Sequence, residues 1–182
     1  ATQRDAQPAI TFGVAVLMLA VLLVAATADV HFSRTVDTFN MGTAIVTIDG
    51  DACSSTDPYG SNDCNFAWGG AYTGHTTLNL TQSIEVGSKL NVDMKIDRVV
   101  PLKFTCAACG ENCTFTVPGV DPITITLPDC PISVGSLDQA FNFTLPTDPP
   151  VPAKTTAKGS VEVVGPDTNT LVKLSIDAIL KP

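Results

Sequence analysis

Basic side chains are scarce in this sequence. Its 182 residues include 10 Lys and Arg but 18 Asp and Glu, which gives a formal net charge of −8. A protein that binds a phosphate backbone needs clustered Lys and Arg, so the composition argues against nucleic acid as a partner. Charged residues of both signs make up only 15% of the chain, whereas hydrophobic residues make up 45%. This balance argues against a disordered chain, which would be rich in charge and poor in apolar residues.

Patterns typical of catalysis are also lacking. The two histidines, His31 and His75, are far apart in the sequence. The chain shows no Ser–His–Asp order, no paired catalytic carboxylates, no Gly-rich phosphate loop and no H-E-x-x-H motif. The sequence therefore predicts a protein that is not an enzyme, with no catalytic residues, no metal site and no cofactor.

Residues 9–28 form a run of twenty residues without a single charge. A helix of that length, at about 1.5 Å per residue, matches the roughly 30 Å hydrocarbon core of a bilayer. A cleavable signal peptide is the alternative, because Ala26-Thr27-Ala28 fits a small-residue cleavage pattern, but its apolar core would be only about 7–15 residues long. We therefore expect a short tail over residues 1–8, an uncleaved transmembrane anchor over residues 9–28 and a separate domain over residues 29–182.

Long helical patterns are absent after residue 29. Apolar and polar residues alternate instead, most clearly over residues 90–97 and 172–180. Such alternation places apolar side chains on one face of a strand and polar side chains on the other. Turn-forming pairs such as Asp49-Gly50 separate the runs. The sequence predicts an all-β fold, an antiparallel β-sandwich of about seven or eight strands, preceded by one N-terminal transmembrane helix.

Six cysteines all lie after the apolar run. An even number of cysteines on one side of a membrane segment indicates an oxidising lumenal or extracellular compartment and up to three disulfides. The sequence thus predicts a single-pass membrane protein with its C-terminal domain in that compartment. The cysteines are Cys53, Cys64, Cys106, Cys109, Cys113 and Cys130. Three N-x-[ST] sequons agree with this location and give the candidate glycosylation sites Asn79, Asn112 and Asn142.

Two other uses of the cysteines compete with disulfides. The C-x2-C-x3-C spacing over residues 106–113, with Cys130, would supply four thiolates to zinc or an iron–sulfur cluster. Cys106 and Cys109 would also suit a thioredoxin-like redox site, which needs a helix N-terminus to lower the thiol pKa. There is no second C-x2-C and no histidine close in sequence, and the β pattern offers no helix. We therefore favour structural disulfides.

Three stretches of the domain carry a family resemblance. The first is a short loop from Cys53 to Cys64, followed by the run VGSKLNVDM at residues 86–94. The second is the Cys130-Pro131 step in DCPI, and the third is the ending GSVEV, a Gly-Pro-Asp turn and TLVKLSI over residues 159–176. In these features the chain resembles the ML lipid-recognition family, which includes the Niemann–Pick type C cholesterol carrier, the ganglioside activator and group 2 mite allergens.

The resemblance has an informative departure. The family usually joins its first strand to its last by a disulfide, but Met41 stands at the first position here and residues 171–180 contain no cysteine. The family's short-loop pair corresponds to Cys53 and Cys64, and its Cys-Pro pair corresponds to Cys130 with either Cys113 or Cys109. A hairpin centred near Val120-Asp121 would bring residues 113 and 130 opposite each other, so we expect the pairs Cys53–Cys64, Cys113–Cys130 and Cys106–Cys109.

The resemblance implies lipid binding or lipid transport. Family members have an immunoglobulin-like sandwich whose two sheets separate and hold a sterol, phospholipid or glycolipid, and each buried CH2 contributes about 0.8 kcal/mol. A bound lipid would be the one non-protein component. The candidate lipid-cavity residues are the apolar members of the alternating runs: Leu90, Val92, Met94, Ile96, Phe104, Phe115, Val117, Phe141, Phe143, Val161, Val163, Leu174 and Ile176.

A second function class is a structural or accessory subunit of a larger membrane assembly, which would use an ML-type domain for docking. A membrane anchor favours this alternative more than it would favour a carrier that gains from diffusing. The expected partners are therefore a lipid, the membrane through residues 9–28 and, for the second class, other subunits of a membrane complex.

Overall fold

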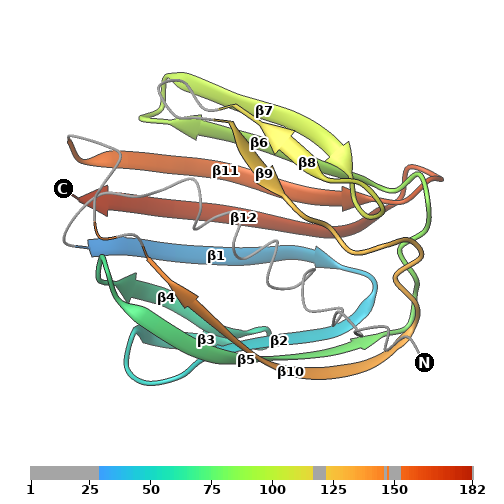
Figure 1. The fold of residues 1–182 in the computed structure, drawn as a ribbon, viewed down its shortest axis with the longest axis horizontal. Helices are drawn as coiled ribbons and strands as arrows, with labels where there is room; N and C mark the ends of the chain where they lie inside the picture. The colour runs from blue at the N-terminus through green and yellow to red at the C-terminus, as the bar shows by residue number, and fades with distance from the viewer. Residues whose placement is uncertain (1–28, 117–121, 146, 148–152, 182) are drawn as a thin grey trace, which may run out of the picture.

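The domain after the apolar run is built from β-strands and their connections (Figure 1). The computed structural model describes residues 29–116, 122–145, 147 and 153–181. The predicted tail and anchor, residues 1–8 and 9–28, lie outside these residues. Among the described residues we find no helix whose length and apolar character would let it cross a bilayer. The prediction of an all-β domain is confirmed for the part of the chain that is described.

Twelve strands make up the described fold, so the expected number of about seven or eight is wrong. The additional strands are short or polar. β3 has the sequence CSSTD and β4 has GSNDCNF, so their apolar residues are too few to form an alternating pattern, and β8 and β9 have only three residues each. The strands are β1 (Asp29–Phe39), β2 (Gly42–Ile48), β3 (Cys53–Asp57), β4 (Gly60–Phe66), β5 (Ala71–Leu80), β6 (Lys89–Ile96), β7 (Val100–Ala107), β8 (Cys113–Phe115), β9 (Ile123–Ile125), β10 (Gly135–Thr144), β11 (Thr155–Val164) and β12 (Thr170–Lys181).

Hydrogen bonds join ten of the strands into one continuous sheet. Its order is β10-β5-β2-β4-β1-β12-β11-β6-β7, with β3 paired to β4, while β8 and β9 form a separate ribbon. β1 connects the two halves of the sheet because it pairs with β12 and, over residues 30–32, with β4. The sheet curves so that the halves face a shared interior, like a sandwich whose layers are joined along β1 (Figure 1).

One strand pair departs from the predicted antiparallel arrangement. β2 and β4 are parallel, with Val46 opposite Gly60. Gly60 has a φ of 102°, and a Cβ at this position would lie 2.0 Å from the carbonyl oxygen of Val46. Only glycine combines that backbone conformation with so close an approach, so this residue permits the parallel contact.

Alternation along the strands decides which side chains enter the interior. On β6, Leu90, Val92 and Met94 are buried, whereas Asp93 between them and Lys95 after them are exposed. The same alternation buries the even-numbered residues 176, 178 and 180 of β12. The period-two pattern read from the sequence therefore fixes the inner face of the sheet.

All six cysteines form disulfides, but two of the three expected pairs are wrong. Cys53–Cys64 is present as expected and joins β3 to β4. The other bonds are Cys106–Cys113 and Cys109–Cys130, in place of Cys113–Cys130 and Cys106–Cys109. The chain reverses after β7 so that β8 packs beside it, which brings Cys113 to Cys106. Cys109 is buried within this turn and meets Cys130 from the distant segment before β10.

Candidate binding cavity

A cavity of about 710 Å3 lies on the concave inner face of the sheet. Both halves of the sheet contribute to its wall, because the inward side chains of their strands face the same space. Its volume falls within the range of roughly 300–1,000 Å3 that is typical of small-molecule sites. The apolar wall residues from the strands and from the β1–β2 turn are Phe32, Val36, Phe39, Met41, Ala44, Val46, Leu78, Leu80, Leu137, Val163, Val172, Leu174 and Ile176.

The segment between β9 and β10 covers the cavity. We call residues 126–134 the cover segment, and most of them line the cavity. Ile132 exchanges two backbone hydrogen bonds with Ile84, at N–O distances of 3.0 and 2.9 Å. The Cys109–Cys130 disulfide ties the same segment to the turn between β7 and β8, where the Gly110 N–H also donates to the Pro128 carbonyl at 2.7 Å. The cover segment is therefore held at two points rather than by a continuous strand ladder.

The mouth of the cavity lies along the cover segment. Asp129, Ser133 and Val134 line the cavity and are also exposed to solvent. At the end of this segment, Gly135 pairs with Leu80, the last residue of β5. The mouth is thus at the end of the sheet where β5 ends and β10 begins.

Arg34 is a buried cation in the cavity wall. It lies on the inner face of β1 between Phe32 and Val36 and is only 7% exposed. Its Nη1 donates to Asp57 Oδ2 at 3.0 Å and its Nη2 donates to Asp57 Oδ1 at 3.2 Å, a bidentate pair. Nη2 also donates to the carbonyl oxygens of Tyr59 and Ser61, at 3.0 and 3.1 Å. The guanidinium charge is therefore neutralised within the protein.

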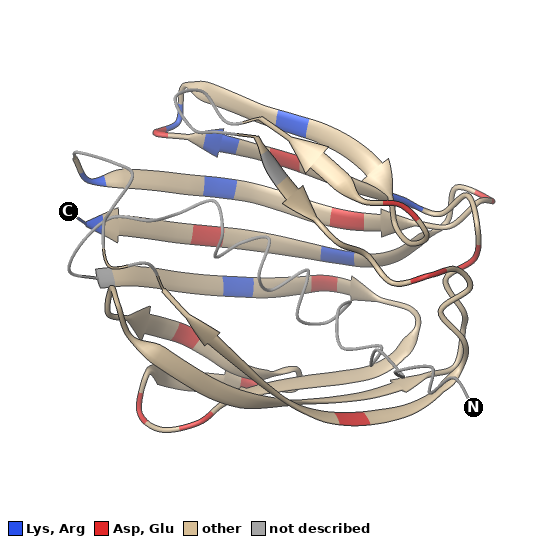
Figure 2. Ribbon diagram, in the orientation of Figure 1, with Lys and Arg blue, Asp and Glu red and all other residues tan. Residues whose placement is uncertain are grey.

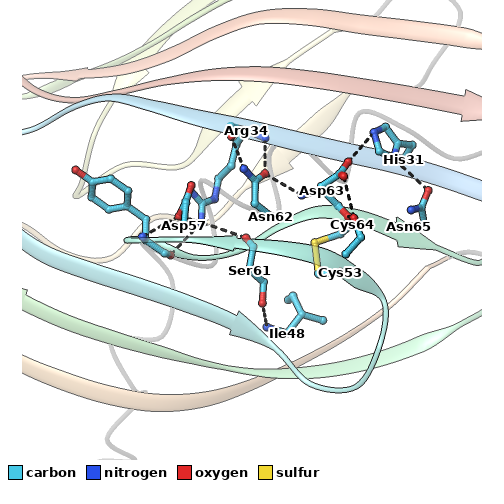
Figure 3. The surroundings of a disulfide bond; sticks show 12 residues. His31, Arg34, Ile48, Cys53, Asp57, Ser61, Asn62, Asp63, Cys64 and Asn65 are labelled. Carbon is cyan, nitrogen blue, oxygen red and sulfur yellow. Dashed lines mark hydrogen bonds and ion pairs between the residues drawn. A yellow bond between two sulfur atoms is a disulfide. The ribbon is translucent and has the colours of Figure 1, made fainter.

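The Cys53–Cys64 disulfide lies at the other end of the hairpin that carries Asp57 (Figure 3). It closes the β3–β4 hairpin, whose turn carries Asp57, so it fixes the carboxylate that faces Arg34. Asn62 of β4 adds a second connection, because its side chain accepts from the Arg34 N–H at 2.9 Å and donates to the Arg34 carbonyl at 2.8 Å. The polar β3–β4 hairpin, which the sequence pattern did not reveal, thus supports one wall of the cavity.

The cavity wall has little net charge. Arg34 and Asp129 are the charged side chains in the described wall, and Asp57 neutralises the first of them. Asp129 lies at the mouth, and the hydroxyl-bearing residues Ser133 and Ser136 also line the cavity. The arrangement suits a ligand with an apolar body and a small polar group at the mouth.

The predicted cavity residues divide among several environments. Val163, Leu174 and Ile176 line the cavity. Ile96 and Phe104 are partly buried against the core. Val117 lies outside the described residues. The remaining members are buried in the core away from the cavity wall: Leu90, Val92, Met94, Phe115, Phe141, Phe143 and Val161.

Tight packing explains why alternation did not locate the cavity. The rings of Phe104 and Phe115 stack with their centroids 4.3 Å apart, so these two side chains meet each other rather than the cavity. In the half of the sheet that contains β4, β5 and β10, the rings of Phe66, Tyr72 and Phe143 likewise pack against one another. Inward residues of a strand share one periodic pattern whether they meet other side chains or a void, so periodicity cannot distinguish core from cavity.

Other wall residues were missed for identifiable reasons. Phe32 and Val36 alternate correctly on β1, but Arg34 between them interrupts the apolar pattern. The cover segment has no alternation, and its prolines, Pro128 and Pro131, are typical of a connection rather than a central strand. No sequence signal available to us would have placed this connection over the cavity.

The three sequon asparagines all have exposed side chains. Asn79 lies on β5, Asn142 on the neighbouring β10, and Asn112 in the turn before β8. Exposure is required for glycosylation, which remains a prediction at each site.

Comparison with solved structures finds chains of similar fold. No protein-family model and no curated protein matches this chain. The crystal structure of chicken MD-1 complexed with lipid IVa is similar with a TM-score of 0.43 and 15% sequence identity, over 87% of this chain and 95% of that chain.

Proposed function

We propose that residues 29–182 form a lipid-binding domain that holds one sterol, phospholipid or glycolipid in the cavity. The observation that carries this proposal is the cavity itself, about 710 Å3 bounded by apolar side chains and covered by a single segment. Three disulfides agree with an oxidising lumenal or extracellular compartment. Residues 9–28 would hold the domain at its membrane.

The energetic argument rests on how protein interiors pack. Interiors are normally filled at the density of organic crystals, so a void of this size leaves its lining side chains without contacts. Water gains little there, because most wall residues offer no hydrogen-bond partner. An acyl chain or sterol body restores these contacts, and each CH2 removed from water contributes about 0.8 kcal/mol.

The test measures uptake of a fluorescent sterol and a fluorescent phospholipid by the delipidated full chain. Ala44→Phe places a ring in the cavity, whereas Ala140→Phe adds the same ring on the exposed face of β10. Overfilling costs about 1–3 kcal/mol, so we expect Ala44→Phe to weaken uptake by about fivefold or more and Ala140→Phe to leave it unchanged. A parent chain that takes up neither lipid would contradict the proposal and favour the accessory-subunit alternative.

A further inference from the structure

The strand register places several distant segments at one end of the molecule. Asp29 lies opposite Lys181, Thr155 lies opposite Leu180, and Ala157 lies opposite Ile96. The start of β1, the end of β12, the start of β11 and the β6–β7 turn therefore share one end. We call it the proximal end, because the chain enters it directly from the apolar run of residues 9–28; it comprises residues 29, 95–101, 153–155 and 180–181.

The most prominent feature of the proximal end is the tip of the β6–β7 hairpin. Val99 and Val100 are adjacent and exposed, by 77% and 37%, although both are apolar. The Val99 N–H donates to the Ile96 carbonyl at 3.1 Å, and the two central residues of this turn, Asp97 and Arg98, have positive φ, 48° and 65°. Turns with positive φ at both central positions prefer Asn and Gly there. Arg98 therefore occupies a backbone conformation that is unfavourable for a long side chain.

The proximal end is locally basic although the whole chain is acidic. Lys95, Arg98, Lys154 and Lys181 lie here and are exposed. Among the residues that define this end, the acidic ones are Asp97 and Asp29; Asp49 and Asp51 lie at the same end in the other half of the sheet. Figure 2 shows blue segments at this end of β6, β11 and β12, whereas the loops at the opposite end are mainly red.

The opposite end of the molecule carries mainly acidic side chains. We call it the distal end; it carries the cavity mouth and the exposed acids Glu85, Glu111, Asp129 and Asp167, with Lys89 as a nearby cation. Electrostatic attraction at a surface falls off within a Debye length of about 8 Å at physiological salt, so the local charge of the proximal end matters more than the net charge of −8.

We propose that the proximal end docks on an anionic lipid bilayer through the β6–β7 tip. Val99 and Val100 enter the boundary between headgroups and acyl chains, and Arg98, Lys154 and Lys181 face the lipid phosphates. Exposed apolar residues flanked by Lys and Arg are the combination that binds anionic interfaces. The bilayer is the occupant favoured by this charge and by the position of residue 29, which directly follows twenty apolar residues.

The β2–β3 turn restricts how the proximal end meets the bilayer. Ile48 of β2 pairs with Gly74, so this turn lies at the same end but in the other half of the sheet, and it carries the exposed acids Asp49 and Asp51. Repulsion between these carboxylates and anionic lipids tilts the domain toward the half that contains β6, β11 and β12.

The test compares the membrane depth of tryptophans at two matched positions. Val99→Trp places the probe at the proximal end and Val86→Trp places it in the loop before β6 at the distal end, where the native residues are 77% and 72% exposed. Both are made in the full chain with Trp68→Phe, so that each variant has one tryptophan. The chains are reconstituted into vesicles of brominated phosphatidylcholine and phosphatidylserine. We expect strong quenching of the Val99→Trp emission and little quenching of Val86→Trp.

Equal quenching of the two probes, quenching of neither, or a chain that does not associate with the vesicles would overturn the proposal. If Trp68→Phe prevents folding, the same comparison is made in the parent chain, where Trp68 contributes equally to both variants. A phosphatidylserine titration supplies the second measurement. Arg98→Ala should weaken docking about fivefold, whereas Lys89→Ala at the distal end should not. An Arg98→Ala chain that docks like the parent would overturn the assignment to an anionic surface.

Docking and cavity binding are measured independently. Lipid uptake is followed without vesicles, and probe quenching does not depend on an occupied cavity. If the chain takes up no lipid, the quenching experiment still tests docking, and if the probes are not quenched differently, the uptake experiment still tests cavity binding.

Discussion

At the scale of the residue, Arg34 determines the electrostatic character of the cavity. An isolated guanidinium in this wall would attract an anionic headgroup, but Asp57 and two carbonyl oxygens already satisfy its donors. Burying such a pair gives little net stabilisation, because desolvation of both charges offsets their attraction. Removing one partner is different, since it leaves a buried charge without compensation.

We therefore expect Asp57→Ala to lower the free energy of unfolding by about 3 kcal/mol. The double variant Arg34→Met/Asp57→Ala should recover most of this loss, because it removes both charges. The exposed pair Lys103–Asp93, at 2.6 Å, is the matched control, and Asp93→Ala should cost less than about 1 kcal/mol. Urea denaturation of the four chains gives all the values.

A double variant that is no more stable than Asp57→Ala would contradict this account. It would mean that the loss comes from the β3–β4 turn, where Asp57 also accepts the Tyr59 N–H at 2.8 Å, rather than from the orphaned guanidinium.

At the scale of the element, the cover segment controls access to the cavity. Its backbone attachments outside its own chain neighbours are the hydrogen bonds between Ile132 and Ile84 and one from the Gly110 N–H to the Pro128 carbonyl, and its covalent attachment is the disulfide to Cys109. Because so few contacts hold it, opening of this segment is the simplest route by which a ligand enters or leaves.

Removing the Cys109–Cys130 bond should therefore accelerate lipid release. Cys109→Ala/Cys130→Ala is expected to lower stability by about 3 kcal/mol in the chain-entropy model and to speed release of a fluorescent lipid at least several-fold in stopped flow. Cys53→Ala/Cys64→Ala is the control, because the native Cys53–Cys64 bond closes a loop that does not include the cover segment. Its removal should lower stability by a similar amount without changing the rate of lipid release. Identical release from both double variants would show that global stability, not the cover segment, sets the rate.

The elements also show how far sequence patterns reach. Strands such as β6 and β12 were predictable because each carries several alternating apolar residues. β3 and β4 were not, since their polar sequences are held in place by a disulfide, a parallel contact at Gly60 and the buried Arg34. Each of these depends on a residue far away in the sequence, which a local pattern does not contain.

At the scale of the whole molecule, charge is separated along the strand direction. The proximal end is basic and apolar, whereas the distal end combines the cavity mouth with exposed acids such as Glu85 and Asp129. Docking through the proximal end would direct the mouth away from the bilayer. Ligand exchange would then occur with a partner or carrier on the aqueous side rather than by extraction from the membrane below.

The same charge separation predicts selectivity among lipids. A fluorescent monoacylglycerol should bind at least about fivefold more tightly than the fatty acid with the same chain, because the mouth repels carboxylates and no unneutralised cation lines the described wall. The difference should shrink at high salt, where the Debye length falls to about 3 Å, and in Asp129→Asn. Tighter binding of the fatty acid would contradict this prediction; equilibrium titrations of both ligands at two salt concentrations decide it.

The sequence by itself determined the all-β character of the domain, the inward face of its long strands and the participation of its cysteines in disulfides. These properties follow from local chemistry: period-two alternation, turn residues and an even number of thiols. Only the tertiary structure decided which cysteines pair, where the inner faces enclose a cavity, and that Asp57 neutralises Arg34. Those outcomes depend on strand register and on contacts between residues far apart in the chain, such as Cys109 with Cys130, which alternation along one strand does not encode.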